Sequence, residues 1–145
     1  MKSKNGFTLI ECIITFAIFG MVLSVVMSLY LTGYKLYRKA ESQSEVEESV
    51  RIVMNRISQI LRYTDDLQDN VSVSDNQLKI RNYKYYLSYT GFHEMINNTS
   101  NNLAQNISHF EAGIENNILT VHIEGGDDTH MPPFIMKQVF YLGGE

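Results

Sequence analysis

Residues 7–31 of this chain, FTLIECIITFAIFGMVLSVVMSLYL, form an almost purely apolar stretch that decides the fold. Within it, residues 12–31 carry no formal charge. In a helix that rises about 1.5 Å per residue, these 20 or so residues span roughly 30 Å, which is the thickness of the hydrocarbon core of a bilayer. The stretch therefore predicts a single transmembrane helix over residues 7–31.

The helix is predicted to continue beyond the membrane, because no proline interrupts the chain before Pro132. Apolar residues recur there at steps of three and four, which places them on one face of a helix: Val46, Val50, Val53, Met54, Ile57, Ile60 and Leu61. Charged residues fall mostly off that face. We expect one helix over residues 7–63, and we assign residues 32–65 to the amphipathic continuation of the membrane span.

The remaining residues, 66–145, contain short stretches in which apolar and polar residues alternate, as is typical of strands. Segments rich in Asn, Asp, Gly or Pro predict turns and loops at residues 74–76, 97–102, 116–117, 125–128 and 132–133. A period of two runs through Tyr83, Tyr85, Leu87 and Tyr89. The predicted fold class is therefore α+β, with a long N-terminal helix packed on an antiparallel β-sheet.

The charge of the chain limits its partners. The 145 residues carry a formal net charge of −4, and removal of residues 1–6 would take away Lys2 and Lys4 and change it to −6. Because phosphate binding needs clustered Lys and Arg, we expect no direct contact with nucleic acid. The single cysteine, Cys12, excludes an intrachain disulfide, and its apolar surroundings predict that it is buried.

Gly6 lies before the apolar stretch, whereas an ordinary secretory signal is cut after it. Cleavage after Gly6 would leave the stretch attached, so the stretch must serve the mature protein. Glu11 places a charge there that costs about 2.5–3.5 kcal/mol at the centre of a span and less near its end. Cleavage before Phe7 creates an α-ammonium group about one helical turn from Glu11. We therefore expect Glu11 to pair with that group on a neighbouring subunit, at low dielectric.

Residues 4–11, KNGFTLIE, resemble the signature of type IV pilins and type II secretion pseudopilins. That signature is a basic leader, then Gly, Phe, Thr, Leu, an aliphatic residue and Glu before an apolar helix. The resemblance implies cleavage between Gly6 and Phe7 by a prepilin peptidase, N-methylation of Phe7, and a role for Glu11 in subunit assembly. It also implies a fibre of major and minor pilins or pseudopilins, for which a platform protein and an ATPase are indirect partners.

Later stretches favour a subclass. Three stretches are similar to the corresponding parts of J-class minor pseudopilins: residues 54–62, 106–110 and 119–123. The Gram-positive competence pseudopilins contain similar stretches. K-class tip subunits usually lack the glutamate, so Glu11 argues against that class. The expected function is a minor pilin or pseudopilin subunit of a type IV pilus-like or type II secretion fibre.

The orientation implied by the resemblance is a single pass through the cytoplasmic (inner) membrane, with the C-terminal domain extracytoplasmic and later part of the fibre. Lys35, Arg38 and Lys39 follow the span, and the positive-inside rule alone would favour the opposite orientation. We follow the cleavage motif, because Lys2, Lys4 and the initiator amine roughly balance that count.

Two alternatives stay open at this point. One is a pilin-type binding module whose sheet captures DNA for uptake, or attaches to a surface. The other is a membrane-anchored protein that keeps residues 7–31 as an uncleaved anchor. We expect no enzyme, because no nucleophile–base arrangement occurs in the sequence.

No cofactor or metal is expected. The four histidines, His93, His109, His122 and His130, lack the spacing of metal ligands, although His109 and His122 can face each other across a hairpin. Asp127 and Asp128 lie in a Gly-rich loop, but two carboxylates are too few for a calcium site. The tyrosines of residues 83–89 favour cross-strand packing over a binding face.

Overall fold

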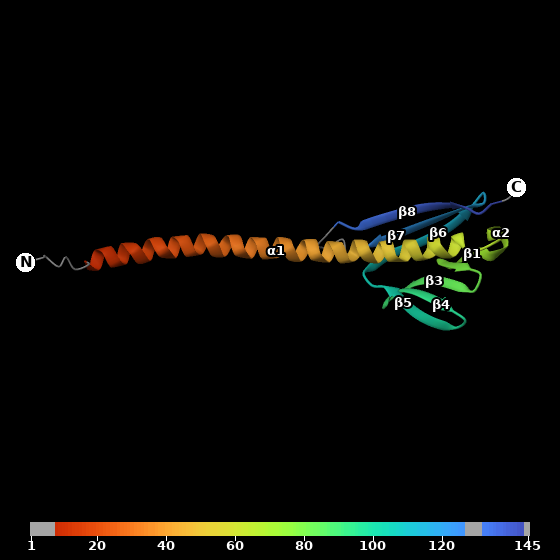
Figure 1. Ribbon diagram of the computed structural model, residues 1–145, viewed down its shortest axis with the longest axis horizontal. Coiled ribbons are helices and arrows are strands. Elements are labelled where there is room, and N and C mark those ends of the chain that lie inside the picture. Colours follow the sequence, from red (N-terminus) through yellow and green to blue (C-terminus); the bar gives the residue numbers. More distant parts are fainter. Residues whose placement is uncertain (1–7, 127–131, 144–145) are drawn as a thin grey trace, which may run out of the picture. The chain divides into compact units, whose positions relative to one another are not determined.

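The computed structural model describes residues 8–126 and 132–143 (Figure 1). The helices and strands of these residues are α1 (Leu9–Arg62), α2 (Leu67–Asn70), β1 (Val71–Ser74), β2 (Gln77–Ile80), β3 (Tyr83–Ser88), β4 (Gly91–Ile96), β5 (Thr99–Ala104), β6 (Ile107–Glu115), β7 (Ile118–Gly125) and β8 (Phe134–Tyr141). The chain divides into two compact units, Met1–Ala40 and Glu41–Glu145.

The first unit consists of the N-terminal part of α1. Within the described residues, α1 is the one helix long and apolar enough to cross a membrane, and its most apolar window has a mean hydropathy of 2.5. The large apolar side chains of this part are exposed in the single chain, among them Leu9, Phe16, Phe19, Met21 and Leu29. A helix that is hydrophobic all round needs lipid or other helices against it. The long helix predicted from the sequence is therefore confirmed over its described residues.

The second unit contains the rest of α1 and two antiparallel sheets. The first sheet has the strand order β1-β2-β3-β4-β5, and the second has the order β6-β7-β8. The predicted α+β architecture is confirmed, but the strands form two sheets where the sequence analysis expected one. Asn106 has a left-handed backbone (φ 60°) between β5 and β6, at the point where the chain leaves the first sheet. Alternation of apolar residues marks strands, yet it does not encode which strands pair.

The core lies between α1 and the inner faces of both sheets, as the helical period predicts. The apolar face of α1 is buried over Val46, Val50, Val53, Met54, Ile57, Ile60 and Leu61. Phe92 on β4 and Phe110 on β6 meet edge to face, with ring centroids 4.8 Å apart, and so connect the two sheets. Figure 1 shows the C-terminal part of α1 lying beside the strands.

Gly125, at the end of β7, permits the close approach of this sheet to α1. A Cβ atom at that position would lie 2.6 Å from Val50 Cγ2 and 2.8 Å from Val46 Cγ1. Carbon atoms do not approach so closely without a shift of the helix or the strand. The glycine is therefore required by packing, because its backbone contacts the helix face directly.

One predicted loop is wrong. Residues 97–102 were expected to form an Asn-rich loop, but only Asn97 and Asn98 form the turn, with left-handed φ values of 47° and 68°. Strand β5 begins at Thr99 and pairs with β4. It is an edge strand with mostly exposed polar side chains, and its pairing comes from backbone hydrogen bonds that leave no apolar pattern in the sequence. The predicted period of two also ends early, because β3 stops at Ser88 and Tyr89 is exposed.

Candidate functional site

The N-terminus of α1 is capped by two side chains that bond to each other's segment, Thr8 and Glu11. The backbone N–H and the hydroxyl of Thr8 both donate to Glu11 Oε2, each at 2.8 Å. The backbone N–H of Glu11 in turn lies 3.4 Å from the Thr8 hydroxyl. This is a capping box, in which two side chains satisfy backbone donors that a helix start leaves unpaired. Gly6 and Phe7, the predicted cleavage residues, lie outside the described residues.

The capping box explains how the first turn tolerates a carboxylate. The amide groups at a helix N-terminus carry a partial positive charge, and negative side chains are favoured there. Both contacts from Thr8 use Oε2, and among the described residues Glu11 Oε1 accepts no hydrogen bond. Glu11 can therefore cap its own helix with one oxygen and accept from a second donor with the other. The sequence analysis missed this pair, although the spacing Thr-x-x-Glu is its standard signal.

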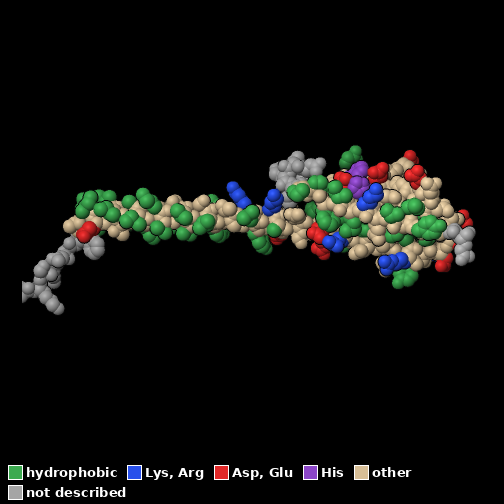
Figure 2. Space-filling model, turned by 90° about the horizontal axis from the view of Figure 1, so that it is seen from above, with side chains coloured by type: hydrophobic (Ala, Val, Ile, Leu, Met, Phe, Trp, Pro, Cys, Tyr) green, Lys and Arg blue, Asp and Glu red, His purple; other side chains and the backbone are tan. Residues whose placement is uncertain are grey.

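The apolar surface that follows Glu11 is continuous along the helix. Figure 2 shows hydrophobic side chains over the visible face of the N-terminal part of α1. Cys12 lies on this surface and is exposed in the single chain, so its predicted burial does not occur within the chain itself. Any packing of Cys12 must come from lipid or from a neighbouring helix.

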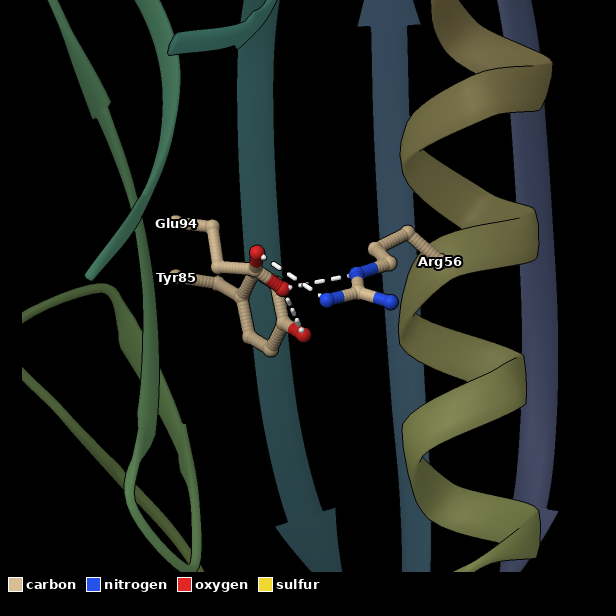
Figure 3. A network of polar contacts seen from close by, with 3 residues as sticks. All are labelled: Arg56, Tyr85 and Glu94. Atoms are coloured by element: carbon tan, nitrogen blue, oxygen red, sulfur yellow. Dashed lines mark hydrogen bonds and ion pairs between the residues drawn. The ribbon is translucent and has the colours of Figure 1, made fainter. Parts of the chain in front are cut away.

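A second polar cluster lies inside the globular unit (Figure 3). Glu94 on β4 is only 3% exposed and accepts from Arg56 on α1, at 2.8 Å from Nε and 3.2 Å from Nη2. The hydroxyl of Tyr85 on β3 donates to the same carboxylate at 2.9 Å. The sequence analysis missed this cluster too. The sequence feature that could have revealed the cluster is a glutamate, Glu94, at an inward position of β4 between Phe92 and Ile96.

These contacts shift two pKa values. Burial, followed by the hydrogen bond to Glu94, raises the pKa of Tyr85 well above its usual range. The hydrogen bond from Arg56 to Glu94 raises the pKa of the guanidinium group, against a smaller opposing effect of burial. A buried carboxylate needs such partners, because an unpaired buried charge is costly. The cluster therefore fixes β3 and β4 against α1.

We expect Tyr85 to make the globular unit sensitive to alkali. Its pKa is higher in the folded than in the unfolded chain, so its contribution is complete below about pH 10 and is lost progressively at higher pH. Wild-type stability should fall by up to about 1.4 kcal/mol per pH unit there, and Tyr85→Phe should remove that part of the slope. Thermal unfolding of the full chain in neutral detergent, followed by circular dichroism between pH 8 and 11, measures this.

Tyr89→Phe is the matched control for this experiment, because Tyr89 is fully exposed in the same region. It should leave the pH dependence unchanged. Parallel loss of stability in the wild type and in Tyr85→Phe above pH 10 would show that Tyr85 is not the group responsible.

His109 and His122, which a hairpin allows to face each other, are diagonal neighbours, since their direct partners in the strand pair are Glu124 and Glu111. The two histidine rings lie 6.0 Å apart across the β6–β7 pair, edge to face. His122 Nε2 lies 3.2 Å from Glu124 Oε1, and His109 Nε2 lies 4.0 Å from Glu111 Oε2. In the described part of the chain, no three His, Cys, Asp or Glu side chains are placed to hold a metal ion. The predicted loop residues Asp127 and Asp128, like His130, lie outside the described residues.

Comparison with known proteins gives one match. Residues 1–27 match the family described as the prokaryotic N-terminal methylation motif. No curated protein and no solved structure shows significant similarity to the chain. The motif implies processing by a prepilin peptidase, and it is carried by type IV pilins and type II secretion pseudopilins, which are generally structural proteins rather than enzymes. The chain therefore carries the N-terminal methylation motif of prepilins at residues 1–27 and a hydrophobic helix consistent with anchoring in the inner membrane, and its described residues form a pilin-like α+β fold.

Proposed function

We propose that this chain is a minor pilin or pseudopilin subunit of a type IV pilus-like or type II secretion fibre. A prepilin peptidase cuts between Gly6 and Phe7, and the new N-terminus at Phe7 is methylated. The mature subunit then leaves the membrane and joins other pilins or pseudopilins in the fibre. A platform protein and an ATPase drive this step without being part of the fibre.

The observation that carries the proposal is the place of the methylation motif on the helix. The motif covers residues 1–27, and the described part of that segment is the start of an unbroken helix with an exposed apolar surface. Such a surface suits lipid before assembly and neighbouring helices after it. Because the leader is cut off before the apolar segment, the mature chain keeps this surface, as a fibre subunit requires.

The chain divides by role along its length. Residues 1–6 are the leader, residues 7–31 are the membrane span, residues 32–65 continue the helix, and residues 66–145 build the sheets. The subunit first crosses the inner membrane once, with its sheets outside the cytoplasm. This division is supported by the change in α1 from an exposed apolar surface to a buried apolar face that begins at Val46.

Glu11 acts between subunits in this proposal. Its Oε2 is occupied by Thr8, and among the described residues Oε1 has no donor. The α-ammonium group of Phe7 on an adjacent subunit is a donor of the right charge. A charge-assisted hydrogen bond at low dielectric offsets the cost of burying both groups and favours one axial stagger between helices.

We expect the mature protein to begin at Phe7 and to carry a methyl group on its α-nitrogen. The reason is the position of Gly6 between a basic leader and the apolar stretch. Mass spectrometry of the N-terminal peptide, from membranes of cells that contain the prepilin peptidase, measures this directly. Cells that lack the peptidase provide the control and should yield a chain that begins at Met1.

The alternative of a membrane-anchored protein that keeps its anchor uncleaved predicts a chain that begins at Met1 in both kinds of cell. A terminus beyond Leu23 would instead identify an ordinary secretory signal. Either result would refute the proposed processing.

A further inference from the structure

A basic hollow lies on the first sheet of this acidic protein. It has a volume of about 400 Å³ and is lined by residues of β1, β2, β3 and β4 and by two turns, residues 81–82 and 97–98. Its cations are Lys79, Arg81 and Lys84. On β2, Leu78 and Ile80 point into the core while Lys79 is exposed between them, so Lys79 faces away from the core.

The charge in the hollow is concentrated and uncompensated. Three of the twelve Lys and Arg residues of the chain line it, whereas no acidic residue does. Lys79 and Lys84 are direct partners in the β2–β3 ladder, and like charges placed opposite each other destabilise a strand pair. Among the described residues, none of the three cations forms an ion pair. By contrast, Arg51 and Arg56 in the same unit are paired with glutamates.

The turns that hold the hollow add a further cost. Arg81 has a left-handed backbone with φ of 51°, a conformation that residues other than Gly, Asn and Asp seldom adopt. Asn97 and Asn98 are also left-handed, which suits asparagine and aims short amides at the same place. Neither the like-charge pair of Lys79 and Lys84 nor the left-handed backbone of Arg81 stabilises the fold. An external anion would supply a stabilising interaction.

The remaining lining residues restrict the chemistry of that anion. The hollow also contains one hydroxyl and four side-chain amides, which can both donate and accept hydrogen bonds, as binding of sugar hydroxyls requires. They belong to Ser74, Gln77, Asn82, Asn97 and Asn98. Tyr83 is the aromatic side chain in the hollow, and Arg56 lies over its ring at 5.8 Å from the centroid. That contact makes the ring a poor platform for stacked bases. The net negative charge of the chain further opposes an extended polynucleotide.

We propose that this hollow binds a short segment of an acidic saccharide. The cations contact its carboxylate or phosphate groups, while the amides bind its hydroxyls. The occupant would be a cell-surface or extracellular glycan, met by the sheets after they leave the cytoplasm. This binding does not depend on how the N-terminus is processed, so the mass-spectrometric test above can fail without affecting it.

The test uses the full chain in neutral detergent micelles and isothermal titration calorimetry. The ligands are an oligogalacturonate for carboxylates, a phosphorylated mannose oligosaccharide for phosphates, a neutral galactose oligosaccharide and a short single-stranded oligonucleotide. At least one acidic saccharide should bind, and the arm that binds identifies the anionic group. Lys84→Gln should weaken that binding by about tenfold or more, which corresponds to the loss of one charge-assisted hydrogen bond.

Lys137→Gln is the matched control, because Lys137 is an exposed lysine on β8 in the other sheet and its substitution changes the net charge equally. It should leave the affinity unchanged. Lys84→Gln should also unfold at the same temperature as the wild type or higher, because it removes a like-charge pair. The proposal is overturned by equal binding of the neutral saccharide, by tighter binding of the oligonucleotide, by equal losses in both variants, or by no acidic saccharide binding at all.

Discussion

Ile57→Asp is expected to destabilise the globular unit by about 3–5 kcal/mol, enough to unfold a marginally stable domain. Ile57 lies on the buried face of α1 and is 0% exposed. The new carboxylate would lose its hydration among apolar side chains, where none of the core residues offers it a cation. Because burial disfavours the charged form, the loss should be greatest at neutral pH and become smaller as the pH falls and the carboxyl is protonated.

Thermal unfolding of the full chain in neutral detergent, read from the strand signal in circular dichroism, measures the effect. Ile52→Asp is the matched control, since Ile52 lies on the same helix and is 45% exposed. Its substitution should change stability by only about 0.5 kcal/mol. Equal melting temperatures for Ile57→Asp and the wild type would contradict the packing of α1 on the sheets.

Glu11→Ala is expected to insert into the membrane and to be cleaved normally, yet to lose incorporation into the fibre. Insertion should be no worse, because the substitution removes a charge from the apolar helix. Cleavage should persist, because Glu11 lies about one helical turn from the scissile bond. Assembly should fail, because the α-ammonium group of the neighbouring subunit would then be buried without its partner. Glu11→Gln should show the same defect if charge matters more than shape.

The capping box requires a further control, because Glu11→Ala also removes the cap of its own helix. Thr8→Val removes the hydroxyl that contacts Glu11 and leaves the carboxylate in place. If the charge acts between subunits, Thr8→Val should retain most of the incorporation. If helix capping alone matters, Thr8→Val and Glu11→Ala should fail alike.

The measurement for these variants is a crosslink between the N-termini of adjacent subunits, formed by a photoreactive residue placed at Ile10. Fibre yield is a poorer measure, since partner subunits can hold a low-copy subunit through its sheets. An undiminished crosslink in Glu11→Ala, at native expression, would refute the role of Glu11 between subunits.

The long helix was predictable because its signals are local. An uncharged stretch, the absence of proline and apolar residues at steps of three and four require nothing beyond the sequence. The same holds for the capping box of Thr8 and Glu11, whose spacing is visible in the chain although it was overlooked. The hairpin at residues 116–117 also follows from local turn chemistry, since both asparagines adopt the left-handed conformation.

The edge strand β5 was not predictable in this way. Its pairing with β4 depends on backbone groups that every residue carries, and its exposed polar side chains look like those of a loop. The division into two sheets was hidden for a similar reason, because pairing is decided between strands and not within one.

By itself, the sequence determined the long apolar helix, its amphipathic continuation, and the methylation motif at residues 1–27. Only the tertiary structure brought Arg56 to Glu94, which are 38 positions apart, and gathered Lys79, Arg81 and Lys84 beside the asparagines of a different turn. The physical reason is the range of the interactions. Helix formation and capping act within four residues along the chain, whereas ion pairs and surface hollows depend on which distant segments the packing of the core places side by side.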